Sequence, residues 1–463
     1  MPLVQAAAKR LKKLVGLDRA IAYTAMARII SIVGSTITVL LIVHFLSPVQ
    51  QGYYYALLSL VSLQAIFELG FSFVVQQLAA HESVHLEYRP DGTFQGHPAA
   101  YSRLASTLQL TVRWYSRAAM VLVAVLVPLG WVFFSSHRHA ADHVAWRAPW
   151  IFAAVACSAT FLLTPFYSFI DGCGQVQQVA FMRMAEAAAA AVSAWIAMIS
   201  HHGLYAPGMI ICGQAMVGAV FLWRRRRLLA ALYRYPVNEH TISWRSEVWP
   251  FQWKIAVSWI CAYFTAQAFI PLLFSLSGPV QAGQMGMSLS ISSYLSVLLL
   301  SWISTKATPF GQLIAQRRFV ELDELFFRTM RQALGLLLLI AGAALGAVVL
   351  LGIVYPRLAH RMVPPHVFAL LLVAMTCNFV VQGLAIYLRS FKREPFLYVY
   401  LATATIAVTL VALTAHRWGA MGAAVSYAIS TGGVGLTSGM MIFRRFRQRG
   451  VTLPIPQATE SIL

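Results

Sequence analysis

Twelve apolar segments of about 20 residues or more divide the chain, and they limit its fold more than any other feature of the sequence. A helix needs about 20 apolar residues to cross the hydrocarbon layer of a bilayer. We therefore predict an all-α integral membrane protein with about twelve transmembrane helices. Their approximate bounds are 20–46, 52–80, 114–136, 149–171, 177–200, 204–223, 249–276, 281–303, 332–355, 365–388, 395–415 and 419–442.

The composition agrees with a membrane protein and leaves no room for an appended catalytic domain. Hydrophobic residues make up 59% of the chain and charged residues 11%, against about 25% charged residues in soluble domains. The five cysteines form no CxxC pair, and the histidines His137, His139 and His143 share one short connection without a reliable further ligand. Phosphate loops and nucleophile elbows are also absent from the sequence, so we predict a protein that is not an enzyme, with no cofactor and no metal site.

The basic residues predict the orientation of the chain. On the predicted topology, 26 of the 35 lysines and arginines lie in the tails or on alternate connections, as the positive-inside rule requires of the cytoplasmic side. Both termini are therefore expected in the cytoplasm. The topology accounts for most of the net charge of +20. We therefore expect the basic residues to contact anionic membrane lipid rather than nucleic acid.

The chain consists of two related halves. Pro48-Val49-Gln50-Gln51-Gly52 recurs as Pro279-Val280-Gln281-Ala282-Gly283, 231 positions later and close to half of 463 residues. Six predicted spans lie on each side of the midpoint, which gives parallel repeats like those of two-lobed transporters. We assign a basic N-terminal segment, an N-lobe, a basic cytoplasmic linker, a C-lobe and a cytoplasmic tail, at 1–19, 20–223, 224–248, 249–442 and 443–463.

Each half offers a cation on a polar helix face. Thr24, Arg28, Ser31 and Ser35 follow helical spacing in the first span, and Lys254, Ser258, Cys261 and Thr265 repeat the pattern 230 positions later. A charge deep in a span costs about 2.5–3.5 kcal/mol and usually faces a wet cavity or a partner. The alternative is that the hydroxyl groups close helix contacts and that Lys254 extends to the inner surface.

Further polar residues lie within or beside other spans. Glu68, one turn after Gln64 in the second span, either neutralises Arg28 or carries a proton. Arg183 and Glu186 are three residues apart in the fifth span and either satisfy each other or take part in transport.

Several segments resemble polysaccharide repeat-unit flippases, the Wzx-like members of the multidrug/oligosaccharidyl-lipid/polysaccharide superfamily. They are Leu46-Ser47-Pro48 followed by Gly52-Tyr53-Tyr54-Tyr55, Phe67-Glu68-Leu69-Gly70-Phe71 and, in the second half, Trp253-Lys254-Ile255-Ala256-Val257-Ser258-Trp259. The resemblance implies a protein of the bacterial inner membrane that moves undecaprenyl-diphosphate-linked oligosaccharide from the inner to the outer leaflet, in O-antigen or exopolysaccharide synthesis. It also implies polysaccharide-assembly proteins as partners.

Given this resemblance, we expect the cations to bind the diphosphate while the two lobes give alternating access. The expected diphosphate-binding residues are Arg28, Lys254, Arg183 and Lys306; the polar cavity residues are Thr24, Ser31, Ser35, Ser258, Thr265 and Gln64; the coupling candidates are Glu68 and Glu186. A multidrug exporter of the same superfamily is the main alternative. A membrane glycan polymerase or ligase is less favoured, because the outside connections are too short to close over a glycan.

Overall fold

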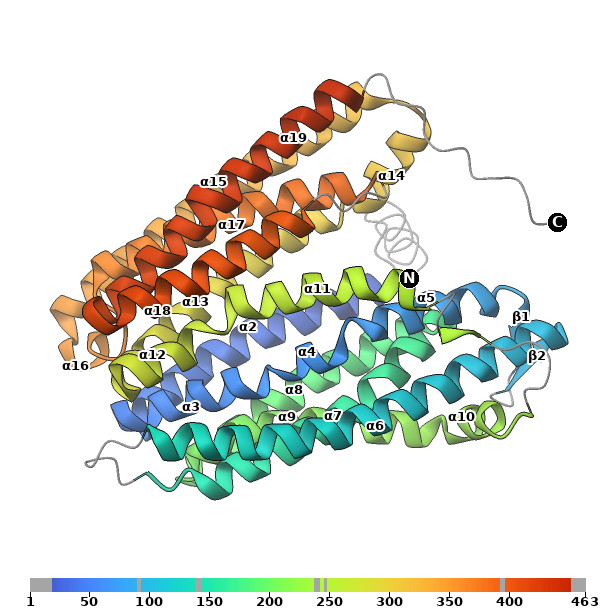
Figure 1. Ribbon diagram of the computed structural model, residues 1–463, viewed down its shortest axis with the longest axis horizontal. Helices are drawn as coiled ribbons and strands as arrows, with labels where there is room; N and C mark the ends of the chain where they lie inside the picture. The colour runs from blue at the N-terminus through green and yellow to red at the C-terminus, as the bar shows by residue number, and fades with distance from the viewer. Residues whose placement is uncertain are drawn as a thin grey trace, which may run out of the picture. The chain divides into compact units, whose positions relative to one another are not determined.

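The computed structural model describes residues 19–89, 93–137, 144–236, 242–244, 248–391 and 396–450 (Figure 1). This part of the chain is almost entirely helical and divides into two compact units. The first unit contains the chain through Tyr263 together with Gly278–Gly283, and the second contains Phe264–Ser277 and the chain from Gln284 onward. Residues 1–18 of the predicted N-terminal segment and 451–463 of the predicted tail lie outside the described residues. The lobe boundaries assigned from the sequence remain predictions.

The first unit consists of long helices that run side by side, joined by short connections (Figure 1). Its elements are α2 (Arg19–Phe45), α3 (Pro48–Val61), α4 (Gln64–Glu68), α5 (Phe71–Ser83), β1 (Leu86–Tyr88), β2 (Phe94–Gly96), α6 (Pro98–Ser136), α7 (Arg147–Gly172), α8 (Val176–Ile199), η1 (Gly203–Tyr205), α9 (Ala206–Arg224), α10 (Arg226–Tyr233) and most of α11 (Trp249–Ala266). The antiparallel β1–β2 hairpin was not expected in an all-α chain, and it occupies the connection between the second and third predicted spans.

The second predicted span is not one continuous helix. Leu69 and Gly70 both have positive φ angles, of 50° and 65°, and they separate α4 from α5. Positive φ is easy for glycine but costly for leucine, so the helix cannot pass through both residues. The segment from α3 through α4 meets α5 at 44°. Glu68 therefore lies at the end of a helix, inside a bent span.

The two copies of the repeated proline motif contact each other. Ser47 caps α3 in a reciprocal arrangement with Gln50, and Pro48 occupies the first turn. One turn later, Gln51 Nε2 donates a hydrogen bond of 2.9 Å to the carbonyl of Gly283, which is the last residue of the second motif. A Cβ atom on Gly52 would lie 2.0 Å from the carbonyl oxygen of Pro279, so only glycine permits this approach.

The second unit contains the remaining helices. They are α12 (Phe269–Ser277), α13 (Pro279–Ser304), α14 (Ala307–Ala315), α15 (Phe319–Val354), α16 (Pro356–Ala359), α17 (Pro365–Arg389), α18 (Leu397–Ala428), the π-helix η3 (Ile429–Leu436) and α19 (Thr437–Gly450). The first turn of α13 belongs to the first unit.

The chain reverses direction within α18. Gly419 has φ 55° and ψ −134°, a backbone conformation that breaks the helix. The hydroxyl groups of Thr414 and Ser426 lie 2.9 Å apart, although twelve residues of continuous helix would extend about 18 Å. The segments on either side of Gly419 therefore form a helical hairpin, which corresponds to the predicted spans 395–415 and 419–442.

The apolar helices confirm a multi-pass membrane protein. In the described part of the chain, nine helices are long and apolar enough to cross a membrane, or ten if the bent pair ending in α5 counts as one span. One of the nine, Leu397–Gln448, contains the two spans of the hairpin. The predicted span 249–276 consists of two helices, α11 and α12, rather than one.

Candidate functional site

The polar face of α2 carries hydroxyl groups that bond to their own helix. Thr24 donates to the carbonyl of Ala20 at 2.8 Å, and Ser31 donates to that of Ala27 at 2.9 Å. Ser35 bonds in the same way to a carbonyl in the preceding turn. Hydroxyl groups satisfied in this manner are tolerated in an apolar helix and keep lone pairs that can accept further hydrogen bonds.

Arg28 lies among these hydroxyl groups as a partly buried cation. Among the described residues, none forms a hydrogen bond or ion pair with its guanidinium group. The helix packs on α8 through other residues: Tyr23 meets Phe181 edge-on with ring centroids 5.3 Å apart, and Trp195 Nε1 donates to Thr38 Oγ1 at 3.1 Å. Arg28 therefore has no counter-ion among the residues that the structure describes.

The corresponding face of the second half is described only in part. The side chains of Lys254 and Ser258 on α11 lie outside the described residues, so the match between Arg28 and Lys254 remains a prediction. Thr265 and Lys306 belong to the second unit. Thr265 is partly buried, and Lys306 is a partly exposed residue that immediately precedes α14.

Arg183 joins an acidic group instead of the α2 face. Its Nη1 atom lies 3.4 Å from Oε2 of Glu186, one turn along α8, and its guanidinium group lies 5.4 Å from the ring centre of Tyr167. It also interacts electrostatically with Glu68 and with Asp171 at the end of α7. We call Glu68, Asp171, Arg183 and Glu186 the charged cluster.

Polar side chains hold the other two acids of the charged cluster. Ser72 hydrogen-bonds to Glu68, and its hydroxyl group also lies 2.9 Å from that of Tyr115 on α6. Gln76 donates to Oδ2 of Asp171 at 2.8 Å. The three carboxylates of the charged cluster therefore all have partners in the described chain.

Sequence reasoning identified Arg183, Glu186 and Glu68 but not their common location. Ser72, Gln76, Tyr115 and Tyr167 were not recognised from the sequence. The available signal was the Gly172-Cys173-Gly174 turn, which brings the end of α7 beside the start of α8. Gln64 also lies within this unit, where its Oε1 accepts a hydrogen bond from Cys157 Sγ at 3.1 Å.

The fold matches known transporters, whereas the sequence matches no family model and no curated protein. The eukaryotic MATE transporter AtDTX14 has a TM-score of 0.56 and 13% identity, with 96% of this chain and 98% of that chain covered. A multidrug resistance MATE family transporter of the MOP superfamily, in an inward-facing conformation, gives 0.55 and 12%, covering 89% and 99%. A MOP superfamily transporter from Pyrococcus furiosus gives 0.51 and 12%, covering 92% and 96%. The chain has the fold of these two-lobed transporters.

Proposed function

We propose that the protein is a flippase of the bacterial cytoplasmic membrane that moves an undecaprenyl-diphosphate-linked oligosaccharide from the inner to the outer leaflet. The cationic groups hold the diphosphate, and the two lobes open alternately to the two sides. The proposal combines the transporter fold with the sequence resemblance to polysaccharide repeat-unit flippases.

The observation that carries the proposal is that the acids of the charged cluster have partners in the described chain, whereas Arg28 has none. The three carboxylates of the charged cluster all lie near Arg183: Glu186 is ion-paired with it, Asp171 accepts a hydrogen bond from Gln76, and Glu68 is hydrogen-bonded by Ser72. Arg28 has no such partner in the described chain. A cation in an apolar helix is costly unless it meets water or an anion. The described part of the lobe therefore favours a negatively charged cargo.

A multidrug exporter is the second candidate, because the matching structures include several MATE transporters, among them the two reported above. An exporter of organic cations needs an acidic residue free to meet its cargo, and in the described chain the acids of the charged cluster are occupied. The Pyrococcus furiosus transporter has a binding pocket of reverse polarity, which suggests a different function for that protein. The same fold can therefore present pockets of opposite charge.

The test is transport by Arg28 variants in proteoliposomes that contain purified lipid-linked oligosaccharide. Arg28→Ala should reduce outward movement by about tenfold or more, since a charge-assisted hydrogen bond contributes on the order of that factor. Arg28→Lys should retain part of the activity because the cargo is an anion. Arg117→Ala removes an exposed arginine from α6 and serves as the matched control.

Normal transport by Arg28→Ala, at an equal amount of folded protein, would refute the role of this residue. Export of organic cations that survives Arg28→Ala, with no movement of lipid-linked oligosaccharide by the unaltered protein, would support the multidrug alternative instead.

A further inference from the structure

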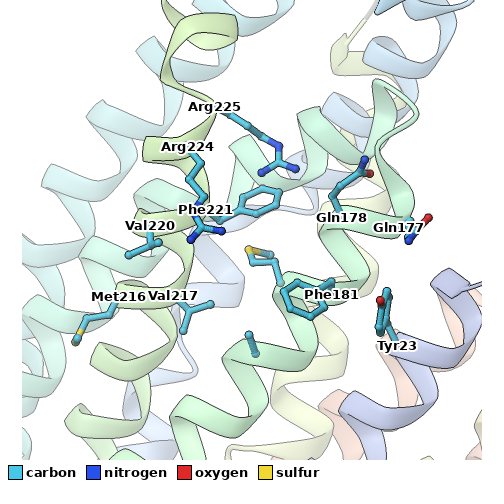
Figure 2. A pocket seen from close by; sticks show the side chains of 12 residues that line it. Tyr23, Gln177, Gln178, Phe181, Met216, Val217, Val220, Phe221, Arg224 and Arg225 are labelled. Carbon is cyan, nitrogen blue, oxygen red and sulfur yellow. The ribbon is translucent and has the colours of Figure 1, made fainter. Parts of the chain in front are cut away.

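A groove of about 620 Å³ opens on the first unit between α8 and α9, with Tyr23 of α2 at one side (Figure 2). Its volume is within the range of small-molecule sites in proteins. One end carries Gln177, Gln178, Arg224 and Arg225, and the rest of the lining is mostly apolar. The groove therefore has a polar, cationic end and a hydrophobic body.

The cationic end is built and held in place. Arg225 Nε donates a hydrogen bond of 2.9 Å to Oε1 of Gln175, and its guanidinium group lies 3.8 Å from the ring centre of Phe221. These contacts fix the side chain at the end of the groove. Burial lowers the pKa of Arg225; the nearby Tyr88 opposes this shift, and the like charge of Arg224 adds to it. An anion placed between the two arginines would relieve both effects.

The apolar body of the groove faces outward from the unit. Phe181, Met216 and Val220 are 50%, 64% and 54% exposed, although they belong to helices apolar enough to cross a membrane. In a bilayer, such side chains contact hydrocarbon rather than water. The arginines at the end of α9 belong to the basic segment that the positive-inside rule assigns to the inner surface.

We propose that this groove binds an anionic phospholipid of the inner leaflet, with the lipid phosphate at Arg224 and Arg225 and an acyl chain along Phe181, Met216 and Val220. Charge complementarity selects the headgroup, since two arginines can grip phosphate oxygens through several hydrogen bonds. An apolar chain fits the remainder of the groove and the depth at which it lies.

The groove differs from the site proposed for the cargo. Arg28 is five residues after Tyr23, which places it about 140° further around α2, away from the side that borders the groove. The lipid site is therefore independent of the substrate that the protein carries, and it holds for either candidate function.

Photolabelling in nanodiscs tests the proposal on the full chain. The discs consist of zwitterionic phosphatidylcholine and contain a trace of phosphatidylglycerol with a diazirine in its acyl chain. Labelled peptides are quantified by mass spectrometry. We expect labelling at Phe181, Met216 and Val220, with competition by unlabelled phosphatidylglycerol but not by added phosphatidylcholine.

Three variants make the assignment specific. Replacing both Arg224 and Arg225 by Gln should reduce labelling in the groove by about tenfold, because charge-assisted hydrogen bonds are lost. The matched control replaces Arg226 and Arg227, which do not line the groove, by Gln. Ala185→Phe fills the apolar body and should reduce labelling while leaving the arginines in place. Gel filtration and the midpoint of thermal unfolding identify any variant that fails to fold.

Two results would overturn the proposal. Equal labelling by a phosphatidylcholine probe, unaffected by the Arg224 and Arg225 substitutions, would mean that the groove holds ordinary boundary lipid. Displacement of the probe by undecaprenyl-diphosphate-linked oligosaccharide, but not by phosphatidylglycerol, would assign the groove to the cargo.

Discussion

Arg183 and Glu186 lie one turn apart on α8, with Nη1 of the arginine 3.4 Å from Oε2 of the glutamate. Arg318 and Glu321 have the same spacing at the start of α15 and approach to 2.5 Å. The environments differ: the Glu186 side chain is 8% exposed, whereas that of Glu321 is 50% exposed. The two pairs therefore share a geometry, but removing the arginine should reduce the stability of the fold by different amounts.

We predict that Arg183→Ala destabilises the protein by about 1–3 kcal/mol: the Arg183 side chain is 49% exposed, but Glu186 is buried and would be left with an uncompensated charge. Glu68 and Asp171 also lose their nearby cation. Arg318→Ala should cost about 0–1 kcal/mol, as for exposed pairs in general. The measurement is thermal unfolding of the purified protein in detergent. Equal shifts for the two variants would show that the charged cluster contributes no special stability.

The contact between the repeated motifs provides a second prediction. Gly52→Ala places a methyl group 2.0 Å from the carbonyl oxygen of Pro279, so α3 and the first turn of α13 must separate. Overpacking of this kind costs about 1–3 kcal/mol. Gly342→Ala is the control, since no atom lies within 4 Å of its added Cβ and alanine favours a helix. We expect a lower unfolding midpoint and slower transport for Gly52→Ala alone, and normal values would argue against a tight contact at this position.

The sequence predicted the general fold because membrane helices have a minimum apolar length that any reading of hydropathy detects. The two motifs from which related halves were inferred, at Pro48 and Pro279, are in contact, and the repetition itself stays a prediction. The break after Glu68 was not predicted. Hydropathy continues unchanged through Leu69 and Gly70, and the bend depends on backbone angles that a glycine permits but does not require.

The site was predicted less completely than the fold. Helical spacing identifies residues on one face of one helix, so Arg28 with its hydroxyl groups and the Arg183–Glu186 pair could be recognised. Partners from different helices could not: Ser72 meets Tyr115 across 43 positions, and Gln76 meets Asp171 across 95. Such contacts depend on which helices pack together, and a single sequence does not state that.

The hairpin in α18 gives a third prediction. The hydroxyl groups of Thr414 and Ser426 are 2.9 Å apart, so cysteines at both positions should form a disulfide within one chain under mild oxidation. A helix continuous through Gly419 would hold these positions about 18 Å apart and prevent the bond. The control pairs Thr414→Cys with Ser430→Cys, one turn further along the returning segment. A disulfide is expected only for the first pair, and its absence there would contradict the hairpin.

The charged cluster also bears on energy coupling. Arg183 is a single cation near three carboxylates, and ionising all of them inside a membrane protein is expensive. Glu186 contacts Arg183 directly, and Asp171 accepts a hydrogen bond from an amide of Gln76, so both arrangements favour the charged carboxylate. Glu68 accepts a hydrogen bond from the hydroxyl of Ser72 and, unlike Glu186, forms no direct ion pair in the described chain. It also lies at the bend between α4 and α5, so it is the acid of the cluster that we select as the proton carrier.

We predict that Glu68 exchanges the proton in a transport cycle driven by a pH gradient. Proteoliposomes containing lipid-linked oligosaccharide allow a pH gradient and a membrane potential to be imposed separately, the potential being worth about 2.3 kcal/mol per elementary charge for each 100 mV. Glu68→Gln keeps the shape but cannot ionise, so it should abolish stimulation by the pH gradient. Glu186→Gln should lower the unfolding midpoint and leave that stimulation in place. If Glu68→Gln responds to the pH gradient as the unaltered protein does, Glu68 is a fixed counter-ion of Arg183; if the potential alone drives transport, no carboxylate of the cluster carries a proton.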